Sequence, residues 1–388
     1  MNSPPRPISL PMIERLIAFD TTSRLSNLSL IHWVRDYLAQ HGIAAELTHD
    51  AAGEKANLFA TIGPTDVGGI VLSGHTDVVP VDGQPWTTDP FQVVERDGRL
   101  YGRGTSDMKS FVAACLALVP HFTSRPLSVP IHLAFSFDEE VGCRGVPLLL
   151  AEVAKRPVRP RGCIVGEPTN MRVVDGHKGK LSLRCDVRGL ECHSSLVHLG
   201  VNAVEYAAEA IAFLKAMARR KKAEGPHDAR FDPPHTSVHV GTVAGGTALN
   251  IVPLACGFDF EFRTIPGEDA SVLLAELETY VRTVLEPEMH AVDPTTGFTI
   301  EEVATFPGLD TPEDSDIVTL AKQLAGQNHT EKVPYGTEAG LFQATGIPTV
   351  VCGPGSIEQA HKPNEFIDLS QVAQCEAFLL KLLERCAR

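Results

Sequence analysis

The stretch that decides the fold is VPIHLAFSFDEEVGCRG, residues 129–145, in which an apolar run leads directly into three consecutive acids. A continuous apolar segment of this kind is typical of a strand buried on both faces of a helix-covered sheet. The acids are Asp138, Glu139 and Glu140. Like charges repel, and burying them costs more still. The sequence therefore predicts that something positive lies beside them.

Three further segments have the same pattern, an apolar run that ends in polar residues. They are GGIVLSGHTD (68–77), GCIVGEP (162–168) and GIPTVVCGPG (346–355). Between them, MKSFVAACLALVPHF (108–122) has apolar residues at helical spacing. Strands that alternate with helices favour an α/β domain. We therefore expect a mostly parallel sheet covered by helices.

The middle of the chain has a different pattern. KLSLRCDVRGL (180–190) and ACGFDFEFRT (255–264) alternate apolar and polar residues, as half-exposed strands do. Two helical stretches, 202–222 and 269–287, fit with the strands into the order βαββαβ, which is the ferredoxin-like pattern. This middle part reads as an α+β domain inserted into the first. The predicted bounds are 1–178 with 307–388 for the buried-sheet domain and 179–306 for the insertion.

Composition limits the classes of function. The 388 residues are 43% hydrophobic and 21% charged, which is ordinary for a globular protein with a sizeable core. The formal net charge of −14 argues against nucleic-acid and anionic-membrane partners. The N-terminal sequence has no signal-peptide pattern, and no apolar stretch reaches the roughly 18 residues of a spanning helix. Nine cysteines without a CxxC pair indicate reduced thiols. We expect a cytoplasmic protein with a small-molecule partner.

Imidazoles and carboxylates follow the buried strands or open a helix: His75, Asp77, Asp107, Glu139, Glu140, Glu167 and His361. The carboxyl ends of strands in an open α/β sheet meet at one crevice, so these side chains should converge. Mixed imidazole and carboxylate ligands suit Zn²⁺, and one carboxylate can bridge two ions. Two metal ions would supply the positive charge that Glu139 and Glu140 require. Singly, each residue has an ordinary alternative, such as a helix N-cap for Asp107.

A set of longer motifs resembles a known family. The motifs are SGHTDVVPVDG, LYGRGTSDMKS, SFDEEVGCRG, VGEPT, GLECHSS and GPGSIEQAHKPNEF. In this order, over about residues 55–370, they resemble the di-zinc deacylases that include acetylornithine deacetylase, succinyl-diaminopimelate desuccinylase and glutamate carboxypeptidase. The segments DEEVGCRG, GTEA and GPGSIEQAH look most like the first branch.

The resemblance implies a ligand set for two divalent metal ions, most simply Zn²⁺, with Co²⁺ or Mn²⁺ as alternatives. His75 and Glu167 look like ligands of one ion, and Glu140 and His361 look like ligands of the other. Asp107 looks like the carboxylate that bridges the two ions.

The resemblance also implies roles around the metals. Glu139 looks like the general base, and Asp77 looks like the carboxylate that orients His75. A cis peptide bond is implied between Asp107 and Met108.

The resemblance also implies that the inserted domain serves as a lid and as the dimerisation domain of a homodimer. Further candidate residues lie in or near this domain. His193 looks like an oxyanion donor, although a polar loop residue is the simpler interpretation. Asn250 and Arg263 look like binders of a substrate carboxylate, but Arg263 shares a strand face with acids and fits a salt bridge equally well. Glu338, in GTEAG, is our own candidate for reading a cationic substrate amine.

The expected activity is hydrolysis of N2-acetyl-L-ornithine to L-ornithine and acetate, as in arginine biosynthesis. A related acylamino-acid deacylase, such as a succinyl-diaminopimelate desuccinylase or a glutamate carboxypeptidase, is the alternative among enzymes. A catalytically silent binder of amino-acid derivatives is the alternative from another class. The chain contains no GxSxG elbow and no P-loop pattern, which disfavours serine-hydrolase and nucleotide chemistry.

Overall fold

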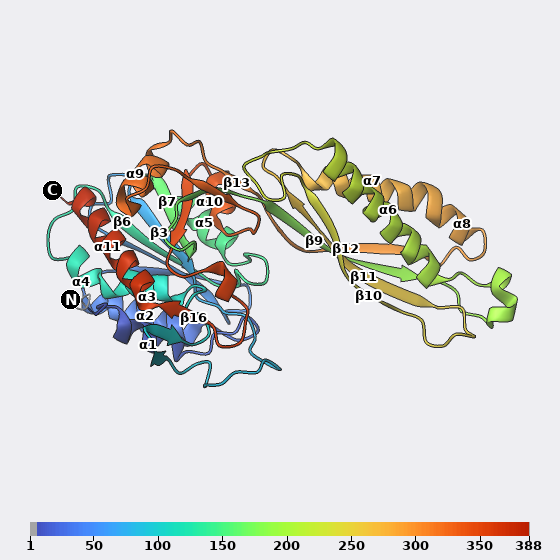
Figure 1. The fold of residues 1–388 in the computed structure, drawn as a ribbon, viewed down its shortest axis with the longest axis horizontal. Helices are drawn as coiled ribbons and strands as arrows, with labels where there is room; N and C mark the ends of the chain where they lie inside the picture. Colours follow the sequence, from blue (N-terminus) through green and yellow to red (C-terminus); the bar gives the residue numbers. More distant parts are fainter. Residues whose placement is uncertain (1–5, 388) are drawn as a thin grey trace. The chain divides into compact units, whose positions relative to one another are not determined.

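The computed structural model describes residues 6–387, which form two compact units (Figure 1). The first unit comprises Met1–Gly176, Leu309–Lys332 and Thr337–Arg388, and the second comprises His177–Gly308 and Val333–Gly336. The second unit thus begins at 177 rather than 179 and ends at 308 rather than 306. It also takes in 333–336, which the sequence does not indicate. In this segment Gly336 lies against the Phe306 ring, and an added Cβ would overlap that ring.

A nine-stranded sheet forms the centre of the first unit, in the order β1-β2-β6-β3-β7-β15-β8-β13, with β14 paired to β8. The strands are β1 (Ala45–His49), β2 (Ala56–Ile62), β3 (Ile70–His75), β6 (Ile131–Ser136), β7 (Gly162–Pro168), β8 (Val174–His177), β13 (Leu309–Asp310), β14 (Glu331–Val333) and β15 (Thr349–Gly353). A separate three-stranded sheet contains β4 (Val94–Arg96), β5 (Arg99–Tyr101) and β16 (Phe366–Asp368).

The four strands predicted from continuous apolar runs lie side by side and parallel, as β6-β3-β7-β15. Every residue in them is buried, which is why their sequences do not alternate. Antiparallel neighbours complete the sheet, since β1 pairs with β2, β2 with β6, and β15 with β8. The predicted α/β class is confirmed, with a parallel centre and antiparallel edges.

Helices flank this sheet (Figure 1). They are α1 (Leu10–Ile17), α2 (Leu28–Gln40), α3 (Lys109–Ala117), α4 (Val119–Phe122), α5 (Val146–Ala154), α9 (Asp316–Ala325), α10 (Ala339–Ala344) and α11 (Leu369–Cys386), with a 3₁₀ turn η3 (Ile357–Gln359). Apolar side chains of α1, α2, α3, α9 and α11 form one large core with the sheet. Helix α3, from the predicted helical stretch, is buried from Lys109 to Leu116 and packs against α1, α11, β3 and β7.

The second unit is a four-stranded antiparallel sheet in the order β10-β11-β9-β12. Its elements are β9 (Gly179–Arg188), η1 (Ser194–Leu199), α6 (Ala203–Glu224), β10 (Ser237–Gly245), β11 (Ala255–Thr264), α7 (Ala270–Tyr280), a π-helical turn η2 (Val281–Leu285), α8 (Glu286–His290) and β12 (Gly297–Phe306). Figure 1 shows α6 and α7 on one face of the sheet. The strand and helix order is the predicted βαββαβ unit.

Alternation in this second sheet has the expected cause. In β9, Leu181, Leu183, Cys185 and Val187 are buried, and the residues between them are half-buried or exposed. The buried side chains form a core with α6 and α7, separate from the core of the first unit. Among residues 6–387, no helix combines the length and the apolar character that crossing a membrane requires.

Candidate active site

The parallel centre of the first sheet brings its polar ends together. His75 is the last residue of β3, Glu167 lies near the end of β7, and Glu140 follows β6 after a short turn. Asp107 lies just before α3, and the peptide bond that follows it is cis, as the resemblance implies. His361 lies beyond β15 and η3, with a left-handed backbone (φ 64°).

Asp107 lies between the two imidazoles and presents one oxygen to each. Its Oδ1 is 3.0 Å from His75 Nε2, and its Oδ2 is 3.5 Å from His361 Nε2. Glu167 Oε1 lies 3.7 Å from His75 Nε2 on one side, and Glu140 Oε2 lies 2.9 Å from His361 Nε2 on the other. The five residues therefore form two imidazole–carboxylate pairs with one shared carboxylate between them.

This donor set fits metal ions. Two groups of side chains have ligand atoms within 4.8 Å of one another: His75, Glu139 and Glu167, and His75, Asp107 and Glu140. Glu167 Oε1 is buried and has no hydrogen-bond partner among the described residues. A buried carboxylate oxygen without a donor is costly, and a cation would satisfy it. Imidazole and carboxylate are ligands that Zn²⁺ accepts.

Carboxylates outnumber imidazoles at the site. Burial raises the pKa of Glu139, Glu140 and Glu167 above the ordinary range, and the neighbouring carboxylates add to the rise. Burial alone would raise the pKa of Asp107 as well, but hydrogen bonds with the two imidazoles hold it well below its usual range. Hydrogen bonds to Asp107 and Glu140 raise the pKa of His361 to about 10. Cations would relieve this crowding of acids, as the sequence predicts.

Asp77 lies beside His75, as expected, and has further contacts as well. His75 Nδ1 makes its short contact, 2.9 Å, with the main-chain oxygen of Asp77, whereas the carboxylate Oδ1 is 3.6 Å away. The carboxylate also accepts from the Ser23 hydroxyl (2.7 Å) and from the main-chain N–H groups of Glu139 (3.1 Å) and Glu140 (3.3 Å). Asp77 therefore connects the end of β3 to the turn that carries both glutamates.

Two further side chains at this turn are not indicated by the sequence. Lys55 Nζ donates to Asp138 Oδ1 at 2.5 Å and to the Ser23 main-chain oxygen at 2.5 Å. Cys143 Sγ lies 3.5 Å from Glu139 Oε1. Lys55 thereby supplies one positive neighbour for the acid run 138–140. Its distance in the sequence from Asp138 explains why no local pattern points to it.

Glu338 lies at the start of α10, packed against β3 and β6, and is not one of the ligand candidates. Its side chain has no exposed surface, and its two oxygens accept from Ser73 (2.5 Å) and Ser136 (2.7 Å). In this structure Glu338 therefore has no surface with which to read a substrate amine. Its contacts instead tie α10 to β3 and β6.

The remaining three candidates belong to the second unit. His193 is exposed just before η1, and the main-chain N–H of Ser195 donates to its Nδ1. A neutral ring that accepts at Nδ1 carries its proton on Nε2, which can then donate. Asn250 is exposed in the loop before β11, and Arg263 Nε donates to Glu261 at 2.7 Å. The salt-bridge alternative for Arg263 is thus what the structure contains.

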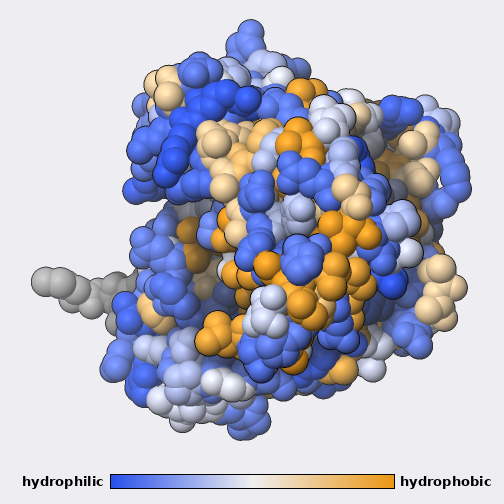
Figure 2. All heavy atoms as spheres, turned by 90° about the vertical axis from the view of Figure 1, so that its right-hand side faces the viewer, coloured by the Kyte–Doolittle hydropathy of each residue, from blue (hydrophilic) through white to orange (hydrophobic). Residues whose placement is uncertain are grey.

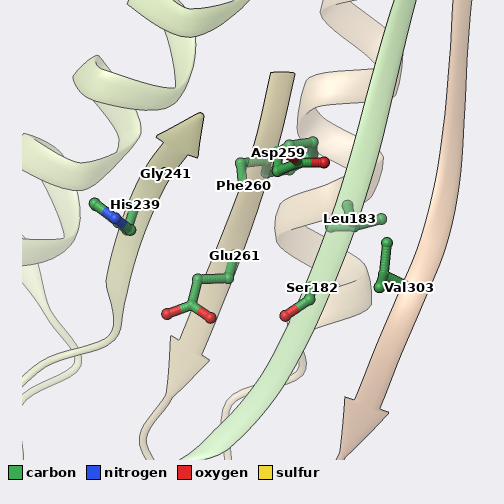
Figure 3. A pocket seen from close by; sticks show the side chains of 8 residues that line it. All are labelled: Ser182, Leu183, His239, Gly241, Asp259, Phe260, Glu261 and Val303. Carbon is green, nitrogen blue, oxygen red and sulfur yellow. The ribbon is translucent and has the colours of Figure 1, made fainter. Parts of the chain in front are cut away.

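The open face of the second sheet has a hollow of about 290 Å³ (Figure 3). It is lined by Ser182, Leu183, His239, Gly241, Asp259, Phe260, Glu261 and Val303. Its two carboxylates are already paired, Asp259 with Arg184 and Glu261 with Arg263. Paired acids are not free to bind a cation, so this hollow does not compete with the cluster around Asp107 as a metal site.

The fold and this cluster define a metal-dependent amide hydrolase with a split α/β domain and an inserted ferredoxin-like domain. Comparison with known families identifies the branch. Residues 71–385 match the family model described as peptidase family M20/M25/M40, and the chain belongs to this family.

Individual relatives agree with this assignment. The chain is 35% identical to an acetylornithine deacetylase from Proteus mirabilis over 95% of this chain and 92% of that protein. It is 36% identical to one from Myxococcus xanthus over 95% of each. An M20 family metallo-carboxypeptidase from Sulfolobus solfataricus has the same fold, with a TM-score of 0.78 and 18% identity over 97% of this chain and 98% of that one.

Proposed function

We propose that this protein hydrolyses N2-acetyl-L-ornithine to L-ornithine and acetate with the aid of two divalent metal ions, most simply Zn²⁺. The observation that carries the proposal is the Asp107 carboxylate between the pairs His75–Glu167 and His361–Glu140. The acetylornithine deacetylases that match nearly the whole chain support the choice of substrate.

His75 and Glu167 would hold one ion, Glu140 and His361 the other, and Asp107 both. Bound there, divalent cations polarise a carbonyl and make water a better nucleophile near neutral pH.

Glu139 handles the proton in this proposal. Its carboxylate belongs to one group of ligand atoms yet is not required to complete either imidazole–carboxylate pair. It takes the proton of the attacking water and gives it to the nitrogen of the leaving amine, so that one water is consumed and acetate and a free amine form.

Binding and orientation fall to the other candidates. Asp77 holds the turn of Glu139 and Glu140 through their main-chain N–H groups. We propose His193 as a donor to the developing oxyanion, supported by the Nε2–H form that Ser195 favours. Asn250 and Arg263 are proposed to bind the substrate carboxylate.

We also propose a cytoplasmic homodimer formed through the second unit. β10 is an edge strand of its sheet. Figure 2 shows hydrophobic side chains gathered on the end of this unit that faces the viewer. Large apolar side chains of this unit are exposed: Leu196, Val197, Leu199, Val243, Leu249, Ile251 and Leu254. Exposed apolar surface and an unpaired strand edge are typical of association surfaces. The nine cysteines are free thiols, which suits a reducing compartment.

The test is steady-state hydrolysis by zinc-loaded protein. N2-acetyl-L-ornithine is compared with N-succinyl-L,L-diaminopimelate, other N-acetyl amino acids and a glutamyl-capped peptide. The highest kcat/KM for acetylornithine supports the proposal. A higher kcat/KM for another of these substrates would show that the protein is a related acylamino-acid deacylase with a different specificity. Metal binding without turnover of any of them would make it a binder of amino-acid derivatives.

A further inference from the structure

Glu365 is a buried carboxylate, four residues after His361, whose hydrogen bonds converge on the loop of Asp107. Its Oε1 accepts from the main-chain N–H groups of Ser106 (2.7 Å) and Asp107 (3.0 Å). Its Oε2 accepts from the main-chain N–H of Gly104 (3.0 Å). Glu365 is only 1% exposed, so these main-chain donors take the place of water around its carboxylate.

Arg103 supplies the counter-charge and extends the network. Its guanidinium, also 1% exposed, donates to Glu365 Oε2 at 2.8 Å. It donates in addition to Gln84 Oε1 at 2.6 Å and to the Lys362 main-chain oxygen at 3.3 Å. Gln84 Nε2 in turn donates to the main-chain oxygen of His361 at 3.1 Å. One connected set of bonds thus ends on the backbone of both Asp107 and His361.

This network ends on the main chains of two metal-ligand candidates, Asp107 and His361, and so it can affect the site as well as the stability of the fold. Asp107 offers one oxygen to each imidazole, so a shift of its backbone changes both sides of the site. His75 is paired with Ser136 in the ladder between β3 and β6, and Glu167 lies within β7, so strands rather than this network carry both residues. His361 lies in a loop with a left-handed backbone and depends on such contacts for its position.

We propose that Glu365 is a positioning residue which, through Arg103 and Gln84, sets the affinity for the metal ion held between Asp107 and His361. The inference rests on the ligand roles given under the proposed function. The ion at His75 and Glu167 depends on Glu365 less, because only the shared Asp107 links it to the network.

The experiment is calorimetric titration of metal-stripped protein with Zn²⁺, using wild type, Glu365→Gln and Gln84→Ala. We expect two binding events in the wild type. Both variants should weaken the second event by about 10- to 100-fold, the range found when partners of metal ligands are removed, and the first event less. Gln84→Ala buries no unpaired charge, so it carries the test if Glu365→Gln fails to fold.

A matched control separates positioning from stability. Glu376 in α11 is also a buried carboxylate, and it accepts from the main-chain N–H (2.8 Å) and hydroxyl (2.6 Å) of Ser9. Glu376→Gln should lower the unfolding midpoint and leave both zinc affinities unchanged. Wild-type affinity for the second ion in Glu365→Gln and Gln84→Ala would overturn the inference while leaving the proposed function intact. Fewer than two zinc ions in the wild type would overturn both.

Discussion

At the scale of the residue, the two oxygens of Asp107 explain how four acids, Asp107, Glu139, Glu140 and Glu167, can share one small region. Each oxygen faces a different imidazole, and each imidazole has a second carboxylate beside it. Glu139 is the one carboxyl of this group that completes neither imidazole–carboxylate pair, and burial raises its pKa to about 8. Position within the cluster, more than residue type, separates the proton carrier from the ligands.

Replacing Glu139 by Gln tests this division of roles. Gln keeps the size of the side chain and cannot carry the proton, so kcat should fall by about 10²- to 10⁴-fold. The zinc stoichiometry should stay at the wild-type value, because Glu139 completes neither pair. Steady-state kinetics and metal analysis measure the two effects. Loss of zinc together with activity would show instead that Glu139 is a ligand.

Sequence reasoning identifies the members of this cluster but not all of their bonds. His75, Asp107, Glu140, Glu167 and His361 can be found because each follows a buried strand or opens a helix, where side chains of an α/β sheet converge. The contacts of Asp77 and Lys55 could not be predicted. They depend on which main-chain groups a folded turn presents, and Lys55 lies 83 residues from Asp138.

At the scale of the element, Glu338 shows that the burial of a polar residue near an active site is not evident from its local sequence. The segment GTEAG gives no hint of burial, yet the carboxylate is enclosed between α10 and the sheet. By contrast, β3, β6, β7 and β15 can be predicted from their apolar runs. Strand β1 cannot, because its five half-exposed or exposed residues, AELTH, contain no such run.

The substrate pair N2-acetyl-L-ornithine and N-acetyl-L-norvaline, which lacks the side-chain amine, tests the structural role of Glu338. Glu338→Gln should change kcat/KM for both substrates by the same factor, because the carboxylate is fully buried and accepts hydrogen bonds from Ser73 and Ser136. If kcat/KM fell for acetylornithine alone, the result would support the hypothesis that Glu338 binds the side-chain amine of the substrate.

The contact between α3 and β7 makes a second prediction at this scale. A Cβ on Gly166 would lie 2.0 Å from the Phe111 ring, so the helix or the strand must move to admit it. Gly166→Ala should lower the free energy of unfolding by about 1–3 kcal/mol through overpacking. Denaturant unfolding measures this change. Gly241→Ala is the control, since its nearest atom would be 3.7 Å away, and an equal loss there would contradict the packing argument.

At the scale of the whole molecule, the chain forms two units, and each unit has its own sequence pattern. Continuous apolar strands build the first unit and alternating strands build the second. The predicted bounds fall short by two residues at each end, and they omit 333–336. These four residues are too few to carry a periodic pattern, and in the fold Gly336 lies against the Phe306 ring.

Stability of the first unit should depend on pH through His132 in β6. Burial, followed by the charge of Arg156, lowers the pKa of this histidine from 6.5 to about 4. The unfolded chain therefore binds a proton between these values that the folded chain does not, so stability falls as pH falls from 6.5 to 4. The loss is about 1.4 kcal/mol per pH unit.

Unfolding of wild type and His132→Gln, compared between pH 7 and pH 4, isolates this contribution. The free energy of unfolding of the wild type should decline more steeply with acidification than that of the variant. Parallel curves would show that the His132 pKa is not lowered in the folded protein.

The central claim is that one carboxylate, Asp107, lies between two metal ions. Anomalous diffraction from zinc-loaded crystals tests it most directly. We predict two zinc peaks per chain, one beside Asp107, His75 and Glu167 and the other beside Asp107, Glu140 and His361. A single peak, or two peaks that do not share Asp107, would contradict the account.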